Sequence, residues 1–219
     1  MLHLNNDQVK DLLEDREDLV IQYMEDVFLD WLDGKAKMIP KTYLTVNSKG
    51  DFRAMPAQWN DTSGVKWISV YPHNHTLELP TIHGTLLLND SLTGQPIISM
   101  DCAELTAYRT AAVSALAGKH LTMNNLVRTL TFIGCGYQAK LHALMYRKVF
   151  PNVMYIHLYD KNKDSAIKLQ KWINATDVVF DDTSTVKLPN VECVIHDNLK
   201  AACSGTDLIT TLTPSTEPY

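Results

Sequence analysis

The sequence lacks the patterns that mark several broad classes of protein. Its four cysteines form no C-x-x-C pair and no spacing typical of metal ligands, so they indicate reduced thiols rather than a disulfide framework. No apolar run approaches the length that crosses a membrane, and the first residues lack the basic and then apolar pattern of a signal peptide. There is no basic tract, and the net charge is −5, which disfavours a nucleic-acid partner. We therefore expect a cytoplasmic protein that binds neither membrane nor nucleic acid.

The composition is that of an ordinary globular protein. The chain has 219 residues, of which 45% are hydrophobic and 21% charged, enough for one large or two small domains. His73 and His75 are spaced like metal ligands, but the sequence offers no third ligand nearby. We therefore expect no metal site.

One stretch has the order of elements that is typical of a dinucleotide-binding site. Residues 130–133 are apolar or β-branched and predict a buried strand, and a helical pattern starts directly after Gly134-Cys135-Gly136. In such a turn, the first glycine allows a sharp bend and the second lets a pyrophosphate approach the backbone. Ala139 fills the third small position, where helix and strand pack closely. The new helix would direct its N-terminal amides at the phosphate.

An acidic residue follows at the position that this interpretation requires. The next predicted strand, residues 153–159, ends at Asp160, whose carboxylate could accept hydrogen bonds from both hydroxyls of a ribose. The alternative is an ordinary aspartate at the end of a strand. Asp160 favours NAD, since a carboxylate repels a 2′-phosphate, but Lys161 and Lys163 keep NADP open.

The remaining pattern predicts two domains. An α+β domain, residues 1–125, precedes a Rossmann-type α/β domain, residues 126–219, of which only the N-terminal part is expected. In the first, we expect helices near residues 6–13, 17–33 and 106–121, and strands at 42–46, 52–55, 65–71, 85–88 and 97–100, with a hairpin turn at 89–94. In the second, we expect further strands at 177–180, 191–194 and 207–213 and helices at 163–173 and 197–203. The second helix carries a stripe that we expect in the core: Val20, Met24, Val27, Phe28, Trp31 and Leu32.

Two cations stand out from their surroundings. Arg109 lies in the first turns of an alanine-rich helix, where the dipole disfavours a cation but a guanidinium could bind a carboxylate or phosphate. Lys66 interrupts an apolar strand. The alternatives are a solvated arginine and the exposed face of an edge strand. Lys41 and Arg53, taken alone, have ordinary surface interpretations.

Several segments together resemble the ornithine cyclodeaminase/mu-crystallin family. They occur in order along the whole chain: Ile39-Pro-Lys-Thr-Tyr-Leu44, Asp51-Phe-Arg-Ala-Met-Pro56, Gly64-Val-Lys-Trp67, Leu79-Pro-Thr81, Leu88-Asn-Asp90 with Thr93-Gly94, Leu105-Thr-Ala-Tyr-Arg-Thr-Ala-Ala112, Ile133-Gly-Cys-Gly-Tyr-Gln-Ala139 and Thr211-Leu-Thr-Pro-Ser215. Members of this family are homodimeric NAD(P) enzymes that act on amino acids or cyclic imines. The resemblance therefore implies an enzyme with a small amino-acid or imine substrate, and it implies that residues 1–125 bind the substrate and form the dimer.

The resemblance also implies roles for particular residues. Lys66 and Arg109 should hold the substrate carboxylate, with Lys41 and Arg53 lining the same pocket. The residues implied at the cofactor are Thr81, Arg109, Thr110, Gly134, Gly136, Tyr137, Gln138, Ala139, Asp160, Thr211 and Thr213. The family's catalytic aspartate and a helix that returns to the first domain are expected beyond Tyr219. We therefore expect the 219-residue chain by itself to be inert and poorly stable.

The implied activity is that of an ornithine cyclodeaminase, which converts L-ornithine to proline and ammonia by an internal hydride shuttle on NAD. Alanine dehydrogenase, ketimine reductase and opine-type synthase are alternatives within the family, and the sequence does not choose the substrate. A non-catalytic, mu-crystallin-like ligand-binding protein or an inactive fragment is the alternative of another class. A third is an unrelated α/β domain with fortuitous glycines.

Overall fold

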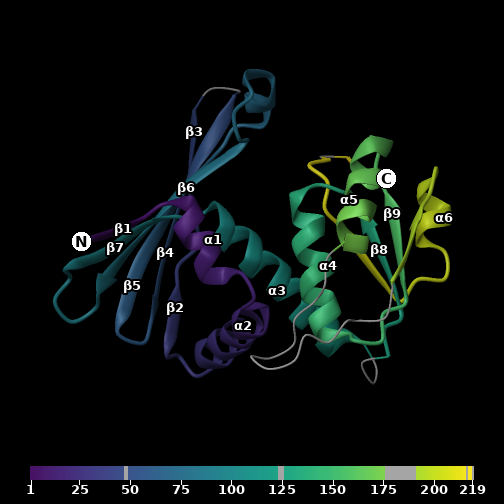
Figure 1. The fold of residues 1–219 in the computed structure, drawn as a ribbon. Helices are drawn as coiled ribbons and strands as arrows, with labels where there is room; N and C mark the ends of the chain where they lie inside the picture. The colour runs from purple at the N-terminus through teal and green to yellow at the C-terminus, as the bar shows by residue number, and fades with distance from the viewer. Residues whose placement is uncertain (47–48, 123–125, 176–190, 216, 219) are drawn as a thin grey trace. The chain divides into compact units, whose positions relative to one another are not determined.

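The computed structural model describes residues 1–46, 49–122, 126–175, 191–215 and 217–218. The chain forms two compact units. Figure 1 colours the ribbon by residue number, from purple at the N-terminus to yellow at the C-terminus. Unit 1 contains Met1–Arg16 and Gln22–Arg109, and unit 2 contains Glu17–Ile21 and Thr110–Tyr219. The domain boundary expected after residue 125 stays a prediction.

Unit 1 is built on a seven-stranded sheet in the order β1-β7-β6-β5-β4-β2, with β3 also paired to β4. Only the β1–β7 pair is parallel; the other pairs are antiparallel. The turn expected at residues 89–94 is confirmed, since Asp90 accepts the amides of Leu92 and Thr93 between β6 and β7. The strands are β1 (Leu2–Leu4), β2 (Ala36–Met38), β3 (Thr42–Val46), β4 (Gly50–Trp59), β5 (Thr62–Val70), β6 (Ile82–Asp90) and β7 (Pro96–Asp101).

The helices begin where local capping allows. Asn5 caps α1 (Asn6–Leu13) through a reciprocal pair of hydrogen bonds with Gln8. A short 3₁₀ helix, η1 (Pro72–Leu77), includes His73 and His75; the side chain of His75 lies outside the described residues. α3 (Ala103–Leu121) starts earlier than expected, because the carbonyl of Cys102 already accepts the amide of Thr106.

The apolar stripe expected in the core along α2 (Glu17–Leu32) is only partly buried. Phe28 is 40% exposed, Trp31 52% and Leu32 83%, so the prediction is wrong for these three residues. The buried residues of α2 are Glu17 and Ile21 instead. The pattern correctly identifies a helix, but it cannot tell which of its apolar residues other segments cover.

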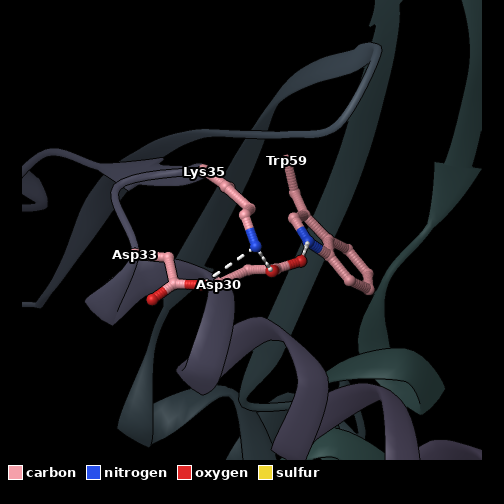
Figure 2. Close-up of polar contacts among 4 residues, drawn as sticks. All are labelled: Asp30, Asp33, Lys35 and Trp59. Atoms are coloured by element: carbon pink, nitrogen blue, oxygen red, sulfur yellow. Dashed lines mark hydrogen bonds and ion pairs between the residues drawn. The ribbon is translucent and has the colours of Figure 1, made fainter.

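A small polar cluster joins α2 to the sheet of unit 1. The indole nitrogen of Trp59, on β4, donates to Asp30 of α2 at 2.8 Å, and Lys35 pairs with both Asp30 and Asp33 (Figure 2). The hydrogen bond from Trp59 is the main cause that lowers the pKa of Asp30 below its ordinary value, with Lys35 contributing. The ionised carboxylate therefore helps to hold the helix on the strand.

We predict a pH-dependent loss of this contribution. Because the pKa of Asp30 is lowered in the fold, the stabilisation is present above the ordinary carboxyl pKa of 3.8 and is lost as the pH falls through the lower value of the folded chain. In urea unfolding at pH 6, Asp30→Asn should be less stable than the wild type, and the difference should shrink at pH 3. Asp33→Asn is the control. The exposed carboxylate of Asp33 pairs with Lys35, but the indole of Trp59 donates to Asp30. A difference between Asp30→Asn and wild type that does not change with pH would contradict the prediction.

Unit 2 is a parallel sheet in the order β10-β9-β8-β11. Its strands are β8 (Thr129–Ile133), β9 (Tyr155–Tyr159), β10 (Glu192–Ile195) and β11 (Leu208–Thr211), and its helices include α4 (Tyr137–Val149), α5 (Lys163–Ala175) and α6 (Leu199–Cys203). Figure 1 shows α4 and α5 on one side of the sheet and α6 on the other. This α/β arrangement confirms the expected Rossmann-type unit. The strand expected at 177–180 lies outside the described residues.

A buried ion pair attaches the first turn of α2 to α4 within unit 2. The ammonium of Lys148, whose side chain is 2% exposed, lies 2.5 Å from Asp18 and 3.8 Å from Glu17. Within the described residues, no helix is both long enough and apolar enough to cross a bilayer.

Candidate functional site

A cavity of about 400 Å³ opens in unit 2 where the strands of the parallel sheet end. Its walls come from the segments that directly follow β8, β9 and β11 and from the start of α6. In open α/β sheets, ligands bind outside the carboxyl ends of the strands, at the place where the strand order reverses. β8 is that place here, since α4 leads from it to β9 while β11 lies on its other side. The lining residues are Ile133, Gly134, Gly136, Tyr159, Asp160, Lys161, Leu199, Leu212, Thr213, Pro214 and Ser215.

The two glycines of the turn serve different purposes. Gly134 has a φ of +96°, and a Cβ there would lie 2.9 Å from the backbone of Leu212, so the fold itself requires glycine. Gly136 has an extended backbone and precedes α4 without a side-chain cap. A Cβ on Gly136 would meet no atom within 4 Å. The space beside Gly136 is thus open to a ligand at the N-terminus of α4, where the helix dipole favours an anion.

Asp160 joins the glycine turn to the end of β9. One carboxylate oxygen accepts the amide of Cys135 at 2.7 Å, and the other accepts the amide of Asn162 at 2.8 Å. A carboxylate has about four acceptor positions, so Asp160 can still receive two hydroxyl groups from the cavity. The side chain therefore both shapes the turn and faces the ligand space.

Cys135 is a structural residue of the same turn. It is 5% exposed, and its thiol lies 3.7 Å from the carbonyl oxygen of Tyr159. Burial, together with the charge of Asp160, raises the pKa of Cys135 to about 12. At neutral pH the thiol is therefore protonated and a poor nucleophile.

The structure brings together part of the predicted cofactor set. Gly134, Gly136, Asp160 and Thr213 line the cavity. Ala139 is fully buried, as expected for close packing of the helix, and Gln138 has a buried amide oxygen with no hydrogen-bond partner among the described residues. The other predicted cofactor residues are not among the lining residues: Thr81, Arg109, Thr110, Tyr137 and Thr211. Their roles stay predictions.

Sequence reasoning missed other residues of this cavity. Leu199 is the first residue of α6 and follows the end of β10. Leu212 comes directly after β11, and Ser215 lies three residues further along the chain. The rule that ligands lie beyond the carboxyl ends of parallel strands could have identified these positions once the strands were placed.

A second candidate site lies in unit 1, around two half-buried cations. Lys66 projects from β5, and Arg109 lies on α3. Burial lowers the pKa of Lys66, and the charge of Arg109 and then of Lys41 lowers it further, so both cations are close enough to repel the ammonium of Lys66. Burial also lowers the pKa of Arg109. Among the described residues, neither Lys66 nor Arg109 has an ion pair with a carboxylate, so this cluster is suited to an incoming anion.

Arg53 differs from Lys66 and Arg109. Its guanidinium forms two hydrogen bonds with Asp51, at 2.5 and 3.1 Å, and lies over the ring of Tyr43. Lys41 lies over the same ring. Arg53 thus has an anionic partner within its own strand, and its predicted place in the substrate pocket is untested. No group of three potential metal-binding side chains occurs in the part of the chain that the structure describes.

Comparison with known proteins gives a consistent result. A family model described as "Ornithine cyclodeaminase/mu-crystallin family" matches residues 5–219. Alanine dehydrogenase of Archaeoglobus fulgidus is 36% identical over 167 residues, which cover 76% of this chain and 50% of the relative. The chain therefore spans about half the length of the curated relatives it matches.

Solved structures extend the similarity to the whole fold. An archaeal alanine dehydrogenase dimer with bound NAD has a TM-score of 0.86 and 31% identity, covering 100% of this chain and 62% of the other. Δ1-Pyrroline-2-carboxylate reductase of Thermococcus litoralis, in complex with NADH and L-proline, has a TM-score of 0.82 and 28% identity, covering 96% and 61%. Together with the family model, these matches confirm the resemblance found in the sequence. The chain belongs to the ornithine cyclodeaminase/mu-crystallin family.

Proposed function

We propose that this chain binds NAD in the cavity of unit 2 and the carboxylate of an amino acid or imine at the cation cluster of unit 1. The observation that carries the proposal is the cavity at the ends of β8, β9 and β11, lined by Gly134, Gly136 and Asp160. Two similar solved structures contain bound NAD or NADH, which supports the same cofactor here.

The residues present fit a dinucleotide. The open space beside Gly136 would accept the pyrophosphate at the N-terminus of α4, and the remaining acceptor positions of Asp160 would bind the ribose hydroxyls. Leu199 offers an apolar wall, and Thr213 lies on the β11 side. When bound, the nicotinamide supplies the hydride chemistry.

Lys66 and Arg109 would hold the substrate. An arginine forms two parallel hydrogen bonds with a carboxylate, and a lysine adds a compact positive charge. Together they would fix the orientation of the carboxylate and hence of the Cα–H bond next to it. Lys41, whose charge reaches Lys66, is proposed as a third contributor.

We propose first the class of reaction and then the particular reaction. The family and its relatives support NAD-dependent chemistry on amino acids or imines. Within this range we retain the ornithine cyclodeaminase reaction, with alanine dehydrogenase, ketimine reductase and opine-type synthase as alternatives. A ligand-binding protein without turnover is the alternative of another class. A homodimer is proposed from the dimeric alanine dehydrogenase, and a cytoplasmic location from the sequence.

Titration of the chain with NAD and NADP tests the proposal. NAD should bind more tightly, because the carboxylate of Asp160 repels a 2′-phosphate. Asp160→Ala should weaken binding of both cofactors, since the amide of Cys135 loses its acceptor. It should also reduce the preference for NAD over NADP. Asp197→Ala is a matched control at the end of β10, since Asp197 pairs with Lys163 and is not a lining residue of the cavity.

Two outcomes would count against parts of the proposal. Equal or tighter binding of NADP would contradict the assignment of NAD. Absence of binding by both cofactors would contradict the cavity assignment itself. Turnover assays distinguish the candidate activities. Turnover of L-alanine indicates a dehydrogenase, turnover of L-ornithine a cyclodeaminase and turnover of L-proline a reductase, whereas a binding protein turns over none of the three.

A further inference from the structure

Among the residues that the structure describes, Lys66 has like-charged neighbours and a single neutral hydrogen-bond acceptor. The groups whose charges act on it are Arg109, Lys41 and the thiol of Cys102. Within the described part of the chain, the one hydrogen bond recorded for its ammonium goes to the hydroxyl of Thr106, at 3.4 Å. Repulsion would turn the long and flexible side chain of Lys66 away from Arg109 and Lys41. The hydrogen bond to Thr106 opposes this repulsion and so helps to determine where the ammonium lies.

Thr106 is placed to link the cations. It lies in the first turns of α3, three residues before Arg109, and residues at this spacing share one face of a helix. Its hydroxyl also shares a hydrogen bond with Cys102, which is fully buried directly before α3. The hydroxyl of Thr106 thus contacts both Cys102, before α3, and Lys66, on β5.

We propose that Thr106 is a positioning residue that holds the ammonium of Lys66 beside Arg109, so that the two cations form one carboxylate site. The identity of the bound anion rests on the proposed function, whereas the contact between Thr106 and Lys66 does not. Thr106 does not touch the substrate in this proposal; it acts through Lys66.

Thr106→Val tests the proposal, because valine keeps the shape of threonine and removes the hydroxyl. Lysines labelled at Cε can be titrated by NMR, with Lys66 assigned from Lys66→Met. Loss of the acceptor removes a hydrogen bond to the charged form, so Lys66 should lose its proton at a lower pH in Thr106→Val than in wild type. Thr106→Ser should restore the wild-type titration. L-Alanine binding at neutral pH should weaken about threefold to tenfold in Thr106→Val, as expected for one hydrogen bond.

The controls separate positioning from general damage. Thr122→Val removes a hydroxyl that bonds the carbonyl of Gly118 and should leave the Lys66 titration unchanged. L-Alaninamide, which has no carboxylate, should not bind. If Thr106→Val does not fold, Thr106→Ala provides the same test.

A folded variant without the hydroxyl whose Lys66 titrates as in wild type would overturn the proposal. If the titration moves but the wild-type chain does not bind L-alanine, the positioning role stands and the carboxylate function fails.

Discussion

Gly136→Val is expected to weaken NAD binding by about a hundredfold or more and to leave the stability of the chain unchanged. The backbone at Gly136 is extended and a Cβ there meets no atom within 4 Å, so valine fits the folded chain. Its side chain would occupy the space through which a pyrophosphate reaches the helix N-terminus. Loss of two charge-assisted hydrogen bonds, each about 1.5–3 kcal/mol, corresponds to a decrease in affinity on the order of a hundredfold or more.

Gly134→Ala is the matched comparison, and its main expected effect is a loss of stability. Alanine at a φ of +96°, with its Cβ 2.9 Å from the backbone of Leu212, strains the turn, and we expect a loss of stability of about 1–3 kcal/mol or more. Thermal melts of both variants and titration with NAD give the result. If Gly136→Val binds NAD as the wild type does, the pyrophosphate does not lie beside Gly136.

Lys66→Met is expected to lose carboxylate binding while it raises the stability of the chain. A half-buried ammonium near Arg109 and Lys41 costs free energy, because partial burial and repulsion both disfavour its charge. Methionine removes that cost and keeps a similar volume. The affinity for L-alanine should fall about tenfold or more, as expected for a hydrogen bond to a charged group. A gain in stability together with a loss of binding is typical of a residue kept for function.

The pH dependence gives a further check on Lys66. Its pKa is lowered in the fold, so between the folded value and the ordinary value of 10.5 the unfolded chain binds more protons. Stability of the wild type should therefore rise relative to Lys66→Met as the pH rises through this range. Lys37→Met, at an exposed position on β2, is the control and should change neither binding nor this pH dependence.

Arg109→Lys completes the test of the cation cluster. Lysine retains the charge but lacks the planar pair of donors, so binding of L-alanine should weaken although the charge is unchanged. Binding that is unaffected in both Lys66→Met and Arg109→Lys would show that the cluster does not hold a carboxylate.

The dinucleotide unit could be predicted because its signals are local. The apolar residues of β8, the glycine turn, the helical pattern of α4 and the acid after β9 follow one another within a short stretch, and each reflects the backbone conformation of its own segment. The candidate site depends on the same local features at Gly134, Gly136 and Asp160. β3 was predicted with the bounds that the structure has.

Features that depend on distant contacts could not be predicted in this manner. Leu199 reaches the cavity only because β10 and β9 pair in parallel and in register. The neighbourhood of Lys66, Thr106 and Cys102 depends on where α3 lies against β5. The exposure of Trp31 and Leu32 likewise depends on which segments cover α2, which no periodicity within the helix encodes.

The ion pair of Lys148 has a consequence for how the chain is made. Lys148 and Asp18 are 130 residues apart in sequence, yet Glu17–Ile21 belongs to the same compact unit as α4. During synthesis, the first turn of α2 leaves the ribosome long before its partner does, so it must stay unpaired until α4 emerges. Such a distant contact adds loop-closure entropy and slows folding. A polypeptide that starts at Thr110 would bury Lys148 without the carboxylates of Glu17 and Asp18. Unit 2 therefore cannot be isolated intact by a single cut in the chain.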